Sequence, residues 1–434
     1  RKQIKELNEK WSKNALRVLA IAFRPLDESG DDYVMEEVEK DVVFLGMVGM
    51  IDPPKEGVRE AVASCRQARI RIIIMTGDHA ITAQAVGKEI GLTDGEDPPV
   101  FTGAEMEAMD DAKLVKILQG SESMIFSRVA PEDKLRIVKL LESQGEVVAV
   151  TGDGVNDAPA LKRAAIGVAM GLTGTDVAKE AAEVVLLDDS FPTLVEAVRE
   201  GRTIYSNLRK TVLASLTTNM AEMAVVLLGL AAVAMGNWAI PILAIQILAI
   251  DLLAEIMPLT FLTFDPPDDN IMQMPPRDKN THIMDLWSSL EVLFLGSVIG
   301  LLAFLNFAFF MSRQSVVISP DMMGSQLFGR ATAITYLTIA FCQFVNILSR
   351  RYEYSSLFNL NIFTNRILLG SIAFSILMVS IGIYGPIISD FLAFRGPGLI
   401  DWFYILGAAA VYLAVFETLK LIKRVRKGRV PQRG

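Results

Sequence analysis

The sequence predicts two regions of different fold class: a soluble α/β region built on a doubly wound parallel sheet, followed by an all-α membrane region of six helices. Two observations support this division. Up to about residue 200, short apolar stretches alternate with amphipathic stretches, which is the pattern of strand–helix units in a parallel sheet. After about residue 210, apolar runs reach the roughly 20 residues that a helix needs to cross a bilayer.

The composition agrees with a protein that lies partly in a lipid bilayer. Of the 434 residues, 51% are hydrophobic, and the mean hydropathy of +0.37 is high for a soluble protein. The formal net charge of −8 argues against nucleic acid as a partner. The two cysteines, Cys65 and Cys342, lie in different surroundings, so no disulfide framework is expected. The chain begins with Arg rather than Met, and we expect it to be a fragment of a longer polypeptide.

Strands and helices alternate through the first region, and turn residues separate them. The predicted strands cover 16–23, 42–50, 70–75, 124–126, 147–150, 165–170 and 183–187. The predicted helices cover 1–13, 56–68, 80–90, 131–143 and 158–165. This alternation predicts parallel strands that share one sheet.

The stretch Thr151 to Pro159 carries the strongest chemical signal. The apolar run 147–150 leads directly into it, which places its polar residues at the carboxyl end of a buried strand, where open α/β sheets bind ligands. Asp153 and Asp157 offer carboxylate oxygens that suit a hard divalent cation, and Asn156 can bond a phosphate oxygen. Taken alone, these residues could equally form a turn without chemistry.

A second loop has the same character. The strand 70–75 runs into Thr76, Gly77 and Asp78, just before a helix N-terminus that favours a phosphate group. An ordinary helix N-cap would also explain Thr and Asp here, but two Thr-Gly-Asp loops after two strands favour a phosphoryl site. Lys134 lies in the first turn of a predicted helix, where the dipole disfavours a cation, so we interpret it as a phosphate ligand. A solvated lysine is the alternative.

Several motifs resemble those of the P-type ATPases, in the order and spacing of that family. The longest covers Thr151 to Lys162, with the sequence Thr-Gly-Asp-Gly-Val-Asn-Asp-Ala-Pro-Ala-Leu-Lys. The others are Asp52-Pro53-Pro54, Met75 to Ala83, Val129 to Lys134 and Gly174 to Ala182. The resemblance continues into the membrane region and covers nearly the whole chain.

The resemblance implies a haloacid-dehalogenase-like domain, in which an aspartate takes the γ-phosphoryl group of ATP and is later hydrolysed. It divides the chain into the end of a nucleotide-binding domain (1–28), the phosphorylation domain (29–200) and the transmembrane domain (201–434). The implied cofactors are ATP and Mg²⁺. Phosphoryl transfer of this kind needs positioning and charge neutralisation more than covalent help.

The resemblance also implies a role for each residue of the two loops. Thr76, Gly77 and Asp78 would hold the phosphoryl group and the nucleotide side, and Lys134 would neutralise charge on the transferring group. Four further residues would act on the metal, the phosphate or the nucleotide. In this set Asp153 binds Mg²⁺, Asn156 and Asp157 order the phosphate and the surroundings of the metal, and Arg17 reaches ATP from the nucleotide-binding domain. An arginine in solvent at a strand edge is the alternative for Arg17.

Two motifs of the family are absent from this sequence: Asp-Lys-Thr-Gly-Thr, which carries the phosphorylated aspartate, and Thr-Gly-Glu-Ser of the actuator domain. The four transmembrane helices that precede the soluble region in the family are also absent. We therefore expect a C-terminal fragment that does not hydrolyse ATP alone. Its partner would be the missing N-terminal part of the pump, in the same polypeptide or on a separate chain.

The membrane region is predicted to cross the lipid bilayer six times. The predicted spans are 211–234, 241–262, 287–312, 331–349, 367–386 and 401–422. Basic residues cluster before the first span and after the second, fourth and sixth, for example at Arg350 and Arg351, as the positive-inside rule requires. We expect a multi-pass protein of the cell membrane whose soluble domain and C-terminus are cytoplasmic. The first span is expected to extend a helix that starts near Leu194.

Four polar side chains in the first two spans indicate an oxygen-rich site for a hard cation. Asn219 and Glu222 are three residues apart, and Asp251 and Glu255 are four apart, so each pair is expected on one helix face. Carboxylates at bilayer depth are costly and are usually functional. A buried hydrogen-bond network is the alternative. Pro258 predicts a kink that frees backbone carbonyls as ligands.

Thr218 and Gln246 belong either to the cation site or only to the packing around it. The resemblance points to light cations, because heavy-metal pumps lack these six helices and carry Cys-Pro-Cys, which is absent here. Ala340 stands where sarcoplasmic calcium pumps place a glutamate, while Gln343 and Asn346 resemble plasma-membrane calcium pumps. Gln343 is therefore a candidate ligand, and one calcium site is favoured over two. Ca²⁺ is favoured, with proton countertransport possible, ahead of Na⁺ or K⁺ and then Mg²⁺.

Two other classes of function stay open. A membrane-tethered haloacid-dehalogenase phosphatase would need an acceptor aspartate in the sheet, and the motif is absent. A non-catalytic partner chain or passive channel would leave the loops at Thr76–Asp78 and Asp153–Asp157 unexplained. The sequence therefore favours ATP-driven transport of a light cation, most of all Ca²⁺, through an aspartyl phosphate.

Overall fold

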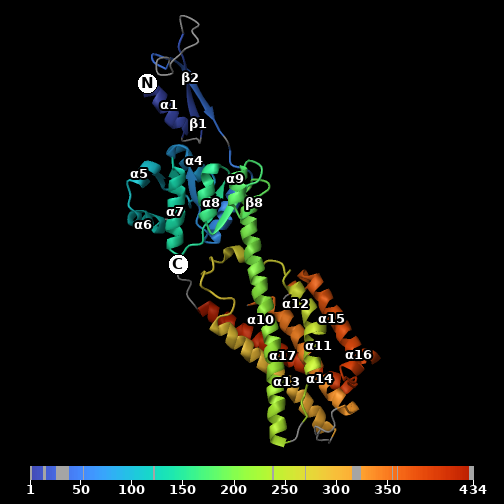
Figure 1. Cartoon of the computed structure of the whole chain (residues 1–434). Coiled ribbons are helices and arrows are strands. Elements are labelled where there is room, and N and C mark those ends of the chain that lie inside the picture. The colour runs from blue at the N-terminus through green and yellow to red at the C-terminus, as the bar shows by residue number, and fades with distance from the viewer. Residues whose placement is uncertain are drawn as a thin grey trace. The chain divides into compact units, whose positions relative to one another are not determined.

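The computed structural model describes residues 2–12, 16–25, 39–51, 53–120, 123–236, 239–268, 270–314, 324–353, 355–358 and 360–429. The chain divides into two compact units. Unit 1 comprises Arg1–Arg199 and Asp269–Asn280, and unit 2 comprises Glu200–Asp268 and Thr281–Gly434. Unit 1 is of the α/β class and unit 2 is helical (Figure 1). The finer division at residues 28 and 200 stays a prediction.

A two-stranded ribbon follows the first helix of unit 1, α1 (Lys2–Ser12). Its strands, β1 (Arg17–Phe23) and β2 (Val43–Met50), pair antiparallel. This arrangement is common for two apolar segments that a polar stretch of sequence separates. Both strands are apolar on both faces and many of their side chains are exposed, including Leu19 and Leu45. The ribbon is not part of the parallel sheets described next.

The other strands of unit 1 all pair in parallel, which confirms the predicted α/β class. They form two three-stranded sheets, in the orders β3-β5-β4 and β6-β7-β8. Their bounds are Ile73–Thr76 (β3), Val100–Thr102 (β4), Met124–Ser127 (β5), Ala149–Gly152 (β6), Ile166–Met170 (β7) and Val184–Leu186 (β8). The sequence predicts one sheet, but within the described residues no pairing joins β3 or β5 to β6. It also misses β4, which is too short to show a hydrophobic period.

Helix α7 (Pro131–Ser143) packs against both parallel sheets. Ile137 and Leu141 share a hydrophobic core with β5, while Val138 shares a second core with β6. The other helices of unit 1 are α3 (Val58–Gln67), α4 (Ala80–Glu89), α5 (Gly103–Glu107), α6 (Asp111–Gly120), α8 (Ala158–Arg163) and α9 (Asp176–Ala181), with 3-10 turns at Val155–Asp157 and Ile271–Gln273. Because α7 touches both sheets, its first turn can serve loops from both.

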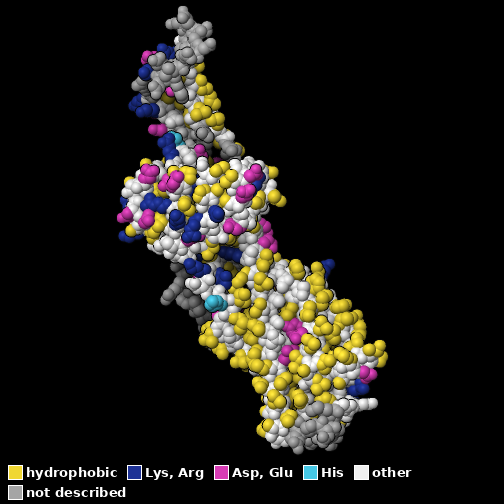
Figure 2. Space-filling view, in the orientation of Figure 1, with side chains coloured by type: hydrophobic (Ala, Val, Ile, Leu, Met, Phe, Trp, Pro, Cys, Tyr) yellow, Lys and Arg dark blue, Asp and Glu magenta, His cyan; other side chains and the backbone are white. Residues whose placement is uncertain are grey.

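Six helical segments in the described ranges of the chain are long and apolar enough to cross a membrane, as predicted. They are α10 (Phe191–Gly236), the segment Ala244–Leu262, α13 (Leu286–Arg313), α14 (Gln326–Arg350), α15 (Arg366–Tyr384) and α17 (Leu399–Arg429). Two short elements, η5 (Leu360–Thr364) and α16 (Pro386–Phe391), lie between them. As predicted, the first span continues a helix that begins well before it. Hydrophobic side chains cover most of the visible face of unit 2 (Figure 2).

The second span is not a continuous α-helix. It runs from α11 (Ala244–Ala249) through a π-helical segment, η2 (Ile250–Glu255), into α12 (Ile256–Leu262). Pro258 explains the break, because a proline lacks an N–H and its ring clashes with the carbonyl of Ala254 in an α-helix. π-Helical turns occur frequently at functional sites.

Two glycines let α13 approach α10 closely. A Cβ on Gly296 would lie 2.7 Å from the carbonyl oxygen of Thr217, and a Cβ on Gly300 would lie 2.7 Å from that of Ala221. Small residues allow such contacts between membrane helices because association there depends on close packing. This contact holds the stretch of α10 from Thr217 to Ala221 against α13, next to Glu222.

Candidate functional site

Asp157 is the centre of the loop that follows β6. One of its carboxylate oxygens, Oδ1, lies 2.7 Å from the Nζ of Lys134. The other oxygen, Oδ2, accepts hydrogen bonds from the backbone N–H groups of Asp153 at 3.3 Å and Gly154 at 3.2 Å. Gly152 makes room for this arrangement, since a Cβ there would lie 2.4 Å from the Cβ of Asp157. The buried Asp157 therefore holds the loop in shape and pairs it with a cation from α7.

The remaining polar side chains of this loop are exposed. Asp153 and Asn156 both point their side chains to the surface, while the backbone carbonyl of Asp153 accepts a hydrogen bond from the N–H of Thr175 at 2.8 Å. An exposed carboxylate and an exposed amide on a loop with a fixed backbone can bind ligands from solution. A turn that served only to connect two elements would need neither the buried Asp157 nor its lysine partner.

The loop that follows β3 has a shape of its own. The N–H of Asp78 donates to Thr76 Oγ1 at 3.1 Å, and that hydroxyl lies 3.3 Å from Asp78 Oδ2. Gly77 and Asp78 are exposed. The N-cap of α4 is His79, and its side chain makes no capping hydrogen bond within the described structure. Thr76 and Asp78 therefore do not act as the ordinary N-cap that the sequence left as an alternative.

Lys134 is not the solvated lysine of the other alternative. Its side chain is 23% exposed, and it lies in the first turn of α7 with its amine on Asp157. Thr76 is the last residue of β3, and Gly152 is the last residue of β6, so both loops leave the carboxyl ends of parallel strands. Such ends are where ligands bind in open α/β sheets.

The membrane unit contains three carboxylates on its first two spans. Glu222 on α10 and Glu255 at the end of η2 are 7% and 4% exposed, and Asp251 is partly buried. Asp251 and Glu255 lie four residues apart on the same segment, η2, and the charges of both act on Glu222. Acidic side chains are also visible within the hydrophobic face of unit 2 (Figure 2).

Several oxygens of these carboxylates lack protein partners. Within the described residues, Oε1 of Glu222 and both carboxylate oxygens of Glu255 are buried without a hydrogen bond. Ser215 and Thr218 on α10 lie close enough to influence Glu255, yet neither makes a hydrogen bond of acceptable geometry to it. Buried carboxylate oxygens without partners are costly, so these atoms need a proton or a cation.

The structure does not bring every predicted ligand into this group. Asn219 is exposed although Glu222 is buried, so the two side chains do not share one environment in this chain, and a ligand role for Asn219 stays a prediction. The Oε1 of Gln343 accepts a hydrogen bond from Asn346 at 2.9 Å, which engages the oxygen that a cation would need. Gln246 belongs to the packing, because it donates to Thr332 and to a backbone carbonyl.

The sequence did not predict a role for Tyr336, and the side chains of Arg17 and Asp52 are not among those that the structure describes. Tyr336 on α14 donates to the carbonyl oxygen of Ala249 at 3.3 Å, where α11 changes to η2. Nothing in the sequence singles out this tyrosine, because its partner is a backbone atom of another span. The backbone of Arg17 lies in β1, but its side chain and the whole of Asp52 are outside the described residues.

No group of three or more His, Cys, Asp or Glu side chains in the described part of the chain is close enough together to hold a metal ion. A cation at Glu222, Asp251 and Glu255 would therefore need other oxygen ligands, such as hydroxyls or the backbone carbonyls of η2, or a closer approach of the carboxylates. The same holds for the loop at Asp153 and Asp157.

Comparison with known proteins extends these observations to the whole chain. The family described as cation transporting ATPase, C-terminus, matches residues 239–422, and the haloacid dehalogenase-like hydrolase family matches residues 2–165. The chain belongs to the P-type cation ATPases. Six apolar helices and membrane ATPase relatives together make it an integral membrane protein.

Three relatives illustrate the range of the family. The chain is 36% identical over 427 residues to calcium-transporting ATPase 1 of Bacillus cereus, a match that covers 97% of this chain and 47% of the relative. It is 33% identical over 421 residues to a calcium-transporting ATPase of Listeria monocytogenes, covering 97% of this chain and 45% of the relative. It is 43% identical over 309 residues to a P-type sodium-transporting ATPase of Toxoplasma gondii, covering 66% and 23%. The chain thus spans about half the length of the first relatives.

Proposed function

We propose that this chain is the C-terminal half of a pump that uses ATP to move Ca²⁺ across a membrane through an aspartyl phosphate. The observation that carries the proposal is a pair of buried glutamates, Glu222 and Glu255, beside the π-helical segment η2. Glu222 Oε1 and both carboxylate oxygens of Glu255 are buried without a hydrogen-bond partner among the described residues. A transported cation would satisfy these oxygens in one state of the pump, and protons would satisfy them in another. This exchange is the basis for proton countertransport.

Ca²⁺ suits the site better than the other light cations. Carboxylates, hydroxyls and backbone carbonyls are the ligands that Ca²⁺ takes in flexible arrangements, whereas Mg²⁺ demands a near-ideal octahedron. Several of the relatives are named as calcium-transporting. Na⁺ or K⁺ is the second candidate, because the relative from Toxoplasma gondii is named as sodium-transporting.

In unit 1, the residues present fit the cofactors that the family uses. The exposed carboxylate of Asp153 is a hard oxygen ligand at the surface of its loop, so it would hold Mg²⁺, which neutralises charge on phosphoryl oxygens when bound. Lys134 carries its charge at the first turn of α7, where it would neutralise the transferring group. Thr76, Gly77 and Asp78 would orient the phosphoryl group of ATP.

The acceptor aspartate would come from a strand that the described residues do not include. Within the described residues, β3 and β6 are edge strands of separate parallel sheets, and both sheets pack on α7. A strand that paired with both edges would join the sheets into the single doubly wound sheet that the sequence predicts. Its carboxyl end would then lie near the loops that begin at Thr76 and Gly152, within reach of Lys134.

The test uses the full-length protein that carries this chain, purified in lipid nanodiscs. ATP hydrolysis is titrated with Ca²⁺, Na⁺, K⁺ and Mg²⁺ in turn, and we expect stimulation by micromolar-range Ca²⁺ that Glu255→Gln abolishes. Glu353→Gln is the matched control, because Glu353 is half exposed and pairs only loosely with Arg209 at 3.9 Å. Stimulation by Na⁺ alone would refute Ca²⁺ as the cargo. Hydrolysis of a phosphate ester without any response to these cations would favour a membrane-tethered phosphatase.

A further inference from the structure

Hydrogen bonds tie the second span to α14 on the side of η2 that precedes its acidic residues. Tyr336 of α14 donates from its hydroxyl to the carbonyl oxygen of Ala249 at 3.3 Å. Gln246 of α11 donates from Nε2 to Thr332 Oγ1 at 3.0 Å. On each helix the two contact residues are three or four positions apart, which places them on one face. That face of α11 is therefore held against α14.

Gln246 also fixes the beginning of α11. Its Oε1 accepts the backbone N–H of Leu243, the N-cap residue, at 3.0 Å. Its Nε2 donates a further bond to the carbonyl oxygen of Leu392 at 3.0 Å. Gln246 is fully buried, so water does not compete for these bonds. Helix α11 is consequently held at its N-cap by Gln246 and at its last residue, Ala249, by Tyr336.

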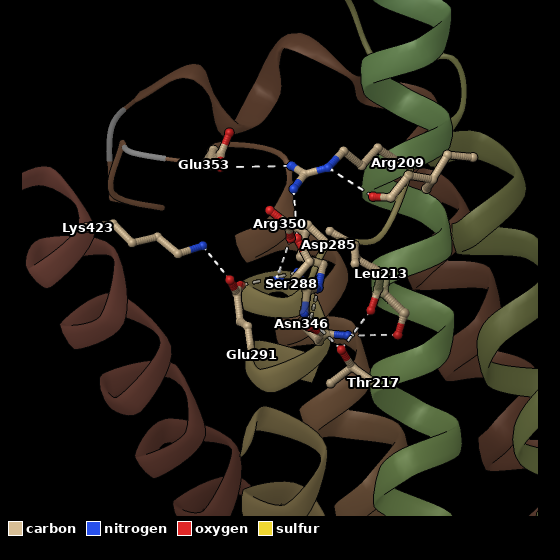
Figure 3. Close-up of polar contacts among 12 residues, drawn as sticks. Arg209, Leu213, Thr217, Asp285, Ser288, Glu291, Asn346, Arg350, Glu353 and Lys423 are labelled. Atoms are coloured by element: carbon tan, nitrogen blue, oxygen red, sulfur yellow. Dashed lines mark hydrogen bonds and ion pairs between the residues drawn. The ribbon is translucent and has the colours of Figure 1, made fainter. Parts of the chain in front are cut away.

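Helix α14 is itself held firmly by its neighbours. Of its apolar stretch, 83% is buried, against at most 39% for the other five spans in the described ranges. At its last residue, Arg350 is only 5% exposed and donates to Thr217 of α10 at 2.8 Å and to Glu291 of α13 at 3.4 Å (Figure 3). The guanidinium of Arg350 also lies over the ring of Phe416 on α17. Helix α14 is therefore a fixed support for α11.

The carbonyl of Ala249 lies where the hydrogen bonding of the second span changes. In an α-helix it would accept the N–H of Leu253, four residues later. The bonding of η2 reaches one residue further, since the N–H of Ile256 donates to the carbonyl of Asp251. Carbonyls at such a change lose ideal helical partners, and a polar group from a neighbouring helix can compensate. The hydroxyl of Tyr336 does this for Ala249, and so stabilises the π-helical form.

Two of the three membrane acids follow this carbonyl closely. Asp251 lies two residues after Ala249, and Glu255 lies six residues after it, at the end of η2. π-Turns and α-turns hold different numbers of residues, so the relative direction of the two carboxylates depends on the bonding of η2. Whatever fixes that bonding also fixes the arrangement of the two acids.

Resting on the proposed function, we propose that Tyr336 is a positioning residue for the transported cation. Its hydroxyl holds the carbonyl of Ala249 and with it the π-helical form of η2. This form keeps Asp251 and Glu255 in the arrangement that binds the ion. Tyr336 does not touch the cation, and it acts only through the backbone of the second span.

Tyr336→Phe tests this inference, because it removes the hydroxyl and keeps the ring, whose centroid lies 4.8 Å from that of Phe394. Full-length protein in nanodiscs is used to titrate ATP hydrolysis with Ca²⁺ and to measure equilibrium binding of ⁴⁵Ca²⁺ without ATP. We expect the Ca²⁺ concentrations for half-maximal stimulation and for half-saturation to rise about 3- to 10-fold, as the loss of one hydrogen bond predicts. The maximal rate at saturating Ca²⁺ and the KM for ATP should not change.

Tyr404→Phe is the matched control. Tyr404 lies on α17 with its ring 4.6 Å from that of Phe309, and its hydroxyl makes no hydrogen bond within the described part of the chain. Its loss should leave the affinity for Ca²⁺ unchanged. Thr332→Val removes the other contact between α14 and α11, so it should weaken Ca²⁺ binding in the same direction as Tyr336→Phe.

The outcomes separate this inference from the proposed function. A folded Tyr336→Phe protein with unchanged affinity for Ca²⁺ overturns the inference, whether or not its maximal rate falls. An equal loss of affinity in Tyr404→Phe overturns it as well, because the effect would then not depend on Ala249. If Tyr336→Phe does not fold, Thr332→Val decides in the same way. An unmodified protein that Ca²⁺ neither binds nor stimulates contradicts the proposed function, and the inference falls with it.

Discussion

The ion pair between Lys134 and Asp157 should be the main electrostatic tie between α7 and the loop after β6, and Asp157→Asn tests this. The two side chains are 23% and 10% exposed. Removing one partner of a buried pair costs about 3–5 kcal/mol, and because Lys134 keeps some contact with solvent we expect about 2–3 kcal/mol. The asparagine amide would also point an N–H group at the lysine or at a backbone donor of the loop.

Amide hydrogen exchange on this chain in detergent micelles measures that loss locally. A loss of about 2–3 kcal/mol corresponds to exchange about 30- to 150-fold faster in peptides that cover α7 and the N–H groups of Asp153 and Gly154. Adding Lys134→Met should recover part of the protection, since no unpaired charge then stays buried. An exchange rate for Asp157→Asn within threefold of the unmodified chain would refute the reasoning.

A matched control lies on the same helix. Arg136 of α7 pairs with Asp111, whose side chain is 66% exposed. Exposed pairs contribute about 0–1 kcal/mol, so Asp111→Asn should change the exchange of α7 by less than about fivefold. An equal effect of both substitutions would mean that burial is not what makes the Lys134 pair important.

Two further predictions concern stability. Gly300→Val should lower the thermal stability of the detergent-solubilised chain by several degrees, because its side chain would meet the backbone of α10 at Ala221, whereas Gly370→Val has no described atom within 4 Å of its Cβ and should change it little. Burial alone would raise the pKa of Asp189, but backbone N–H groups of the loop after β7 and a threonine hydroxyl outweigh it and hold the pKa at about 2. Since this folded pKa lies below the unfolded value of 3.8, the charge stabilises unit 1 fully above about pH 4, and the gain is lost as the pH falls toward 2. Acid titration of Asp189→Asn, followed by circular dichroism, should lack that component, and an unchanged profile would count against it.

Much of this structure can be predicted from short stretches of sequence, because the spans and the two loops each depend on the residues of a single stretch. The six spans follow from apolar runs, and the loops at Thr76 and Asp153 follow from glycine and acid after buried strands. The pairing of Lys134 with Asp157 cannot be read in this way, since it depends on how α7 packs against β6. The hydrophobic pattern of the sequence also cannot predict that the parallel strands divide into two sheets.

Arg350 shows the same limit inside the membrane. In the sequence, Arg350 follows an apolar span, and a basic residue at such a position indicates the cytoplasmic side of the membrane. Its burial depends on partners from three other helices, the nearest of them, Glu291, 59 positions earlier in the chain. The spacing that places Asn219 beside Glu222 does not show that its side chain is exposed, because exposure depends on what packs around α10, and its ligand role stays a prediction.

The π-helical segment of the second span has a mechanical consequence. A π-turn holds more residues than an α-turn, so η2 keeps about one residue of slack within the span. If Ile250–Glu255 returned to α-helical bonding, each later residue of α12 would turn by about 100° around the helix axis. The face of α12 that contacts α15 would change with it. A ligand that drew Asp251 and Glu255 together would favour one of these two bonding states of η2. A small movement at the ion would then be converted into a rotation of α12 about its own axis.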